Sequence, residues 1–87
     1  MTLEILGDGS VDVVAQMRDA IESAIPCDTL DISSRSPGHF AIRVVSAAFA
    51  DLNRVKQQQL VYGAIASLMA GDAAPVHAID RLECVKP

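Results

Sequence analysis

The sequence predicts a single α+β domain with the element order α-β-β-α-β, in which both helices pack on one face of a three-stranded mixed sheet. Two segments carry apolar residues at helical spacing, and three others alternate apolar and polar residues with a period of two. The chain of 87 residues is 51% hydrophobic, which suffices for one compact core but not for two domains.

The first helix is expected to begin at Ser10, which suits an N-cap, with Asp12 in the first turn near the positive end of the helix dipole. Pro26 ends it. Its apolar positions recur at helical spacing: Val13, Val14, Met17, Ala20, Ile21, Ala24 and Ile25. Residues 1–9 contain two glycines and are expected to form a poorly ordered leader.

Two antiparallel strands joined by a short loop are expected next. Leu30 and Ile32 alternate with polar residues, as in a half-buried strand. Residues 34–38 are rich in turn-forming types and predict the loop. His39 then opens a second strand, over residues 40–46.

The second helix is expected to follow a cap at Asp51 or Asn53 and to end near Ala70, before Gly71. Its apolar face is Val61, Ala64, Ile65, Leu68 and Met69. Positive charges near a helix N-terminus oppose the dipole, so helix stability does not require them there. The first turns therefore form either a partner surface or a solvated face, with these residues: Arg54, Lys56, Gln57 and Gln58.

A third strand is expected from Val76 to about Val85, parallel to the second because a helix connects the two. Strict alternation directs four residues toward the core: Val76, Ala78, Leu82 and Cys84. It directs four others away from the core: His77, Ile79, Arg81 and Glu83.

The composition disfavours several classes of function. The formal net charge is −4, with seven basic and eleven acidic residues, so the basic surface of a nucleic-acid binder is not expected. The sequence contains no nucleophile elbow, phosphate loop or CxxC pair, so we expect no enzyme and no self-contained zinc site. Neither a signal peptide nor a membrane span is indicated, and we expect a cytoplasmic protein.

Two histidines are the candidates for metal chemistry. His77 opens the third strand, where its ring is expected to be reachable, although an ordinary surface histidine fits the same position. His39 opens the second strand. Two imidazoles do not complete a four-ligand site, so further ligands would come from a second molecule. Cys84 is expected to face the core in a structural role, and Cys27 to pack at the first helix–strand junction.

Several short motifs follow one another along the chain: HF at residues 39–40, a strand ending in VVS, a Phe at position 49, RVKQQQLVYG at residues 54–63 and VHAI at residues 76–79. Taken together, these motifs resemble the BolA-like family, and the resemblance covers about Val13 to Pro87. The RVKQQQLVYG stretch is most similar to the IbaG (YrbA) type of bacterial members. The resemblance implies a class II KH-like fold, which agrees with the element order above.

The resemblance also implies a monothiol glutaredoxin as partner, with a [2Fe–2S] cluster bridged between the two proteins in cluster trafficking or iron sensing. In family complexes the glutaredoxin gives a cysteine, glutathione gives a thiolate, and the histidine of the HA motif, here His77, completes the contact. The isolated chain is expected to hold no cofactor, as a monomer or weak homodimer. The resemblance also implies a second ligand in the loop before the second strand, where many members have a cysteine or a histidine. Ser36 occupies the cysteine position here, and His39 is the only replacement within reach.

Two departures from the family pattern concern partners. Many members have Arg-His-Arg where this chain has glutamines at residues 57–59. The KH-like fold of the family suggests an alternative function, that of a nucleic-acid-binding transcriptional regulator, which would use Arg54 and Lys56. The lost positive charges disfavour that alternative. The chain ends in VKP, without the Thr-Pro-x-x-Trp tail of the family, and we expect an altered partner surface.

Overall fold

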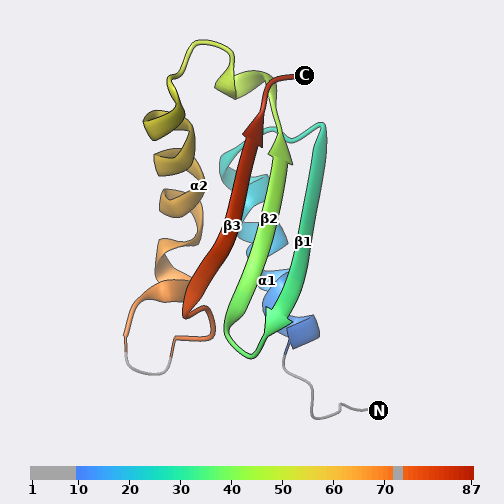
Figure 1. Ribbon diagram of the computed structural model, residues 1–87, viewed down its shortest axis with the longest axis vertical. Coiled ribbons are helices and arrows are strands. Elements are labelled where there is room, and N and C mark those ends of the chain that lie inside the picture. Colours follow the sequence, from blue (N-terminus) through green and yellow to red (C-terminus); the bar gives the residue numbers. More distant parts are fainter. Residues whose placement is uncertain (1–9, 72–73) are drawn as a thin grey trace.

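The computed structural model describes residues 10–71 and 74–87, and their order of elements is the predicted α-β-β-α-β (Figure 1). The expected leader, residues 1–9, lies outside the described residues. The elements are helix α1 (Ser10–Ala24), strands β1 (Thr29–Ser36) and β2 (His39–Val45), the 3₁₀ turn η1 (Ala47–Phe49), helix α2 (Arg54–Met69) and strand β3 (Ala78–Val85).

The three strands form one mixed sheet in the order β1-β2-β3. β1 and β2 are antiparallel, and β2 and β3 are parallel, as expected for strands joined through a helix. Figure 1 shows α1 behind the sheet and α2 beyond β3. Alternate residues of β2 share a core with both helices, which places the two helices on one face of the sheet, as predicted.

The core forms because the apolar stripe of each helix meets this inner face of the sheet. Ten apolar residues of this core are at most 2% exposed: Met17, Ile21, Ile25, Phe40, Ile42, Val44, Phe49, Val61, Ile65 and Val76. Asn53 caps α2 as expected, since its side chain accepts the Lys56 backbone N–H at 2.9 Å.

The turn between β1 and β2 is shorter than the sequence predicts. β1 continues to Ser36, which pairs with His39, so only Pro37 and Gly38 lie between the strands. Gly38 has φ 79°, the value that the third residue of a type II turn needs, and Pro37 suits the residue before it. The polar residues expected in the loop belong to β1 because they pair with β2. This pairing is a tertiary effect that local turn propensity does not predict.

The alternation predicted for β3 is wrong at its start, because the strand contains a β-bulge. Phe40 pairs with Ile79, but the next residue of β2, Ala41, pairs with Arg81, so Asp80 is an extra residue in β3. Ile79 consequently faces the core, which it contacts, instead of facing away. Ala78 pairs with His39 on the opposite face and not with the core residues.

Neither described helix is long and apolar enough to cross a membrane.

Candidate functional site

Both candidate histidines lie at one end of the sheet. Parallel strands begin at the same edge, so the first residues of β2 and β3 are neighbours, and His39 pairs with Ala78 directly after His77. In Figure 1 this is the lower end, where the short turn before β2 lies next to the segment that enters β3. The fold therefore gathers residues that are far apart in sequence, as the candidate site requires.

His77 is exposed, as predicted, and its backbone is fixed on both sides. The preceding residue, Val76, is 1% exposed and donates its N–H to the Leu68 carbonyl at 3.1 Å. The Gly38 carbonyl accepts the N–H groups of His77 at 2.8 Å and of Ala78 at 3.0 Å. His77 thus lies just before β3, not within it, with its ring open to solvent and its main chain held against the neighbouring turn.

His39 contacts a carboxylate that the sequence analysis did not single out. Its Nδ1 lies 3.1 Å from Oδ1 of Asp80, and the two side chains are 43% and 44% exposed. Asp80 is the bulged residue of β3, 41 positions away in the sequence. Strict alternation gives no sign of a bulge, so no signal in the sequence pointed to this pair.

The donors of this chain do not form a metal site by themselves. Among the described residues, no group of three or more His, Cys, Asp or Glu side chains is arranged to hold an ion. Imidazole is nevertheless a normal ligand of iron, and His replaces Cys in part of a [2Fe–2S] site in Rieske centres. The residues present therefore suit a cluster whose other ligands come from a second molecule.

The two cysteines do not add to this site. Cys84 packs against the core, as predicted, toward the far end of β3, where burial raises the pKa of its thiol. Cys27 packs at the junction after α1, also as predicted, and donates to the Ile25 carbonyl at 3.2 Å. Burial, then the nearby Glu22 and Asp28 carboxylates, raise the pKa of the Cys27 thiol. Both thiols are held in the protonated form, which is the poorer ligand.

The polar residues of the α2 N-terminus lie far from the histidines. α2 has 16 residues and so is about 24 Å long, and in Figure 1 its first turn is at the end opposite the turn before β2. Arg54 and Lys56 are exposed and Gln58 is half-buried. A groove of about 420 Å³ runs between this turn and the end of β3, lined by Arg43, Arg54, Gln57, Gln58, Leu82, Glu83, Cys84 and Val85.

The prediction that Gln57 presents its side chain to a partner requires a correction, because the residue contributes little exposed area to this groove. Only 8% of the residue is exposed. Its Nε2 donates to the carbonyls of Phe49 at 3.1 Å and Leu52 at 2.9 Å, both in the connection before α2. A glutamine one turn into a helix can reach back to carbonyls that precede the helix, and here that reach gives Gln57 a structural role.

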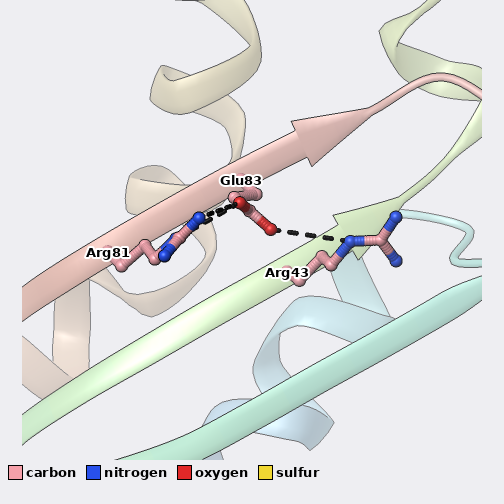
Figure 2. Close-up of polar contacts among 3 residues, drawn as sticks. All are labelled: Arg43, Arg81 and Glu83. Atoms are coloured by element: carbon pink, nitrogen blue, oxygen red, sulfur yellow. Dashed lines mark hydrogen bonds and ion pairs between the residues drawn. The ribbon is translucent and has the colours of Figure 1, made fainter.

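The open face of the sheet carries a charged group of three residues. Figure 2 shows Glu83 between two arginines: it accepts from Arg81 at 2.7 and 3.2 Å and lies 3.5 Å from Nε of Arg43 on the adjacent strand. All three side chains are at least 38% exposed. Exposed pairs of this kind contribute little to stability.

Comparison with known proteins decides the family. A family model described as BolA-like protein matches residues 19–85. The chain belongs to the BolA-like family. None of the curated proteins matches it significantly. The IbaG type that the sequence suggested is not distinguished from other members by these matches and stays a prediction.

Solved structures agree with this assignment of the BolA-like protein. A bol-like protein from Babesia bovis superposes with a TM-score of 0.72 at 25% identity, covering 84% of this chain and 83% of that one. BolA1 from Mus musculus superposes with a TM-score of 0.70 at 26% identity, covering 98% of this chain and 70% of that one. The BolA domain of SufE1 from Arabidopsis thaliana superposes with a TM-score of 0.72 at 21% identity, covering 95% of this chain and 96% of that one. At this identity the match supports the fold alone.

Proposed function

We propose that this BolA-like protein is a non-enzymatic adaptor that binds a monothiol glutaredoxin and shares a [2Fe–2S] cluster through His77, in iron–sulfur trafficking or iron sensing. The observation that carries the proposal is the exposed imidazole of His77, held by its main chain to Gly38, in the position of the family's HA motif. A ligand offered to a second molecule must be reachable and carried on a well-held main chain, and His77 meets both conditions.

The need for a partner follows from the donor set. Within the described residues the chain offers imidazoles but no arrangement of three metal-binding groups. A glutaredoxin cysteine and a glutathione thiolate would supply the missing sulfur ligands, as the family resemblance implies. The cluster is the cargo of this exchange. A neutral imidazole in place of a thiolate removes negative charge and raises the cluster's reduction potential.

The chain's own residues have the task of presenting His77. Val76 anchors the segment in the core, and the Gly38 carbonyl receives the next two backbone N–H groups. A partner that also reached Arg54 and Lys56 would have to extend along α2, over about 24 Å. The nucleic-acid alternative that relies on those two residues gains no support from the described part of the chain.

The test is to co-express the protein with a monothiol glutaredoxin and to purify the pair with glutathione under anaerobic conditions. The wild-type pair is expected to show the visible absorption and circular dichroism bands of a [2Fe–2S] cluster. The variant His77→Ala should change both spectra, whereas Ser33→Ala, an exposed change on β1, should leave them as they are.

Three other results would contradict the proposal. A coloured complex with the same spectrum in His77→Ala would show that another residue holds the cluster. A colourless complex that persists in His77→Ala would indicate heterodimerisation without metal. A salt-dependent shift in DNA mobility, without any coloured complex, would favour the nucleic-acid regulator.

A further inference from the structure

Helix α2 has an exposed side that lacks the charges of an ordinary surface helix. Its buried residues are Gln57, Val61 and Ile65. Opposite them, exposed residues recur at helical spacing: Val55, Gln59, Tyr62, Gly63 and Ala66, followed by Ala70 directly after the helix. From residue 57 to residue 71 the sequence contains no charged residue. Surface helices normally carry charged residues on the side that faces water, so this side of α2 is suited to being covered.

The large apolar residues that the described part of the chain leaves exposed all lie on α2. They are Val55, which is 61% exposed, and Leu60 and Tyr62, each of which is 39% exposed. Figure 1 shows α2 at one side of the molecule, with the sheet on its inner side. Single exposed apolar residues are common on protein surfaces, whereas a group of them on one uncharged helix indicates an interaction surface.

The residues on the exposed side of α2 are ordered by size along the helix. The larger ones come first and the smaller ones follow: Val55, Gln59 and Tyr62, then Gly63, Ala66 and Ala70. Two antiparallel copies of α2 can be aligned with Tyr62 of each opposite Gly63 of the other. The same alignment places Gln59 opposite Ala66, and Val55 opposite Ala70. Each larger side chain then meets a small one, as close packing of two helices requires.

The charge at the start of α2 fits the same antiparallel arrangement. Lys56 is exposed in the first turn, where it opposes the dipole of its own helix. The last turn of α2 carries no basic residue to complement its negative end. In an antiparallel pair the first turn of one helix lies beside the last turn of the other, so each Lys56 complements the dipole of the second copy. The exposed side of α2 is therefore complementary to itself in both size and charge.

We propose that the exposed side of α2 binds the same side of a second copy of this chain, in an antiparallel, two-fold symmetric dimer. A helix of 16 residues is about 24 Å long and about 10 Å wide, so the contact is far smaller than the ~800 Å² per partner of a stable complex. The dimer is consequently weak and forms at high protein concentration. It requires neither His77 nor a cluster, and so it is independent of the function proposed above.

The first test compares the isolated chain over protein concentrations from about 10 μM to about 1 mM, which spans the range of weak complexes. Sedimentation equilibrium should show a monomer–dimer equilibrium. Amide resonances of ¹⁵N-labelled protein should shift with concentration on the exposed side of α2 and stay fixed on the open face of the sheet. Ala66→Glu places an unpaired charge in the interface and should weaken the dimer at least about 10-fold. Ala15→Glu, at an exposed alanine of α1, is the matched control and should change nothing.

Two further variants test the direction of the helices. Lys56→Glu should have effects of opposite sign, because it suits the dipole of its own helix but not that of the second copy. The midpoint of urea unfolding at low protein concentration should rise, while the dimer becomes severalfold weaker. An equimolar mixture of Gln59→Lys with Ala66→Glu should associate more tightly than Ala66→Glu alone, since the antiparallel alignment puts residues 59 and 66 opposite each other.

A chain that stays monomeric up to about 1 mM, or that shows concentration-dependent shifts only on the sheet, would overturn the proposal. Shifts on α2 that appear only when a glutaredoxin is added would also overturn it, because the surface would then belong to that partner. A mixture of the two variants that associates no better than Ala66→Glu alone would overturn the antiparallel arrangement. Circular dichroism of each variant in the far ultraviolet distinguishes a lost contact from a lost fold.

Discussion

A Cβ atom at position 38 would overlap Cδ2 of His77 and lie 2.8 Å from its Cγ. Gly38 also has φ 79°, a conformation that residues with a side chain rarely adopt. The turn between β1 and β2 and the segment before β3 therefore come together only because position 38 has no side chain. This contact joins the local structure of a hairpin turn to the placement of the candidate ligand.

The first prediction is that Gly38→Ala destabilises the protein and displaces the His77 ring. The positive φ alone is expected to cost about 1–3 kcal/mol of unfolding free energy. The clash adds to that cost unless the ring rotates away. Urea unfolding gives the free energy, and the chemical shifts of the His77 ring report its movement.

Two other glycines serve as controls for Gly38→Ala. Gly71 has φ 87° but open space around it, so Gly71→Ala should show the backbone strain without the clash. Gly63 lies inside α2, and a Cβ atom added there would meet no atom outside the helix backbone within 4 Å. Because alanine favours the helix over glycine, Gly63→Ala should stabilise the protein by about 0.5–1 kcal/mol. If the cost of Gly38→Ala is the same in a His77→Ala background, the contact between the two residues does not contribute to it.

A second prediction concerns Gln57, whose buried amide donates to two backbone carbonyls in the connection before α2. Gln57→Leu keeps most of the volume but removes both donors. We expect a loss of about 1–2 kcal/mol in unfolding free energy, because two hydrogen bonds are lost, although the Phe49 carbonyl still accepts the Leu52 N–H at 3.1 Å. Thermal and urea unfolding measure this loss. The exposed neighbour offers the matched control, Gln59→Leu, and equal effects of the two changes would show that the hydrogen bonds of Gln57 are unimportant.

A third prediction concerns stability at alkaline pH. Burial raises the pKa of both Cys27 and Cys84 above the ordinary value of 9.0. The folded protein therefore holds these thiol protons more tightly than the unfolded chain does. Their contribution to stability is complete below the unfolded pKa and is lost as the pH rises from about 9 through the folded pKa.

Unfolding midpoints in urea at pH 8 and pH 10 measure this loss under reducing conditions. Lysine and tyrosine also titrate in this range, so the comparison is between the wild type and the double variant Cys27→Ala with Cys84→Ala. The midpoint should fall less in the double variant than in the wild type. Equal falls would mean that the thiol protons are held equally in both states.

A fourth prediction concerns the three charged residues on the open face of the sheet (Figure 2). Glu83→Gln removes the charge that lies between Arg43 and Arg81. Because these side chains are exposed, we expect the unfolding free energy to change by less than about 1 kcal/mol, with a smaller difference at high salt. A larger change that salt does not reduce would mean that Glu83 acts through packing.

The sequence by itself determined the order of the elements, the ends of α1 and α2, the apolar stripes that build the core, and the exposure of His77. Such features depend on residues close together in the chain: the periodicity of Val61 and Ile65, the cap at Asn53, the stop at Pro26.

Only the tertiary structure decided which residues meet across the fold. The bulge at Asp80, the inward side chain of Ile79 and the contact of Asp80 with His39 result from the pairing of β2 with β3. Gln57 is buried because carbonyls outside its helix accept its amide. One unpaired residue in a strand leaves local propensities unchanged, so its position is fixed by long-range hydrogen bonding and packing, which a local pattern does not encode.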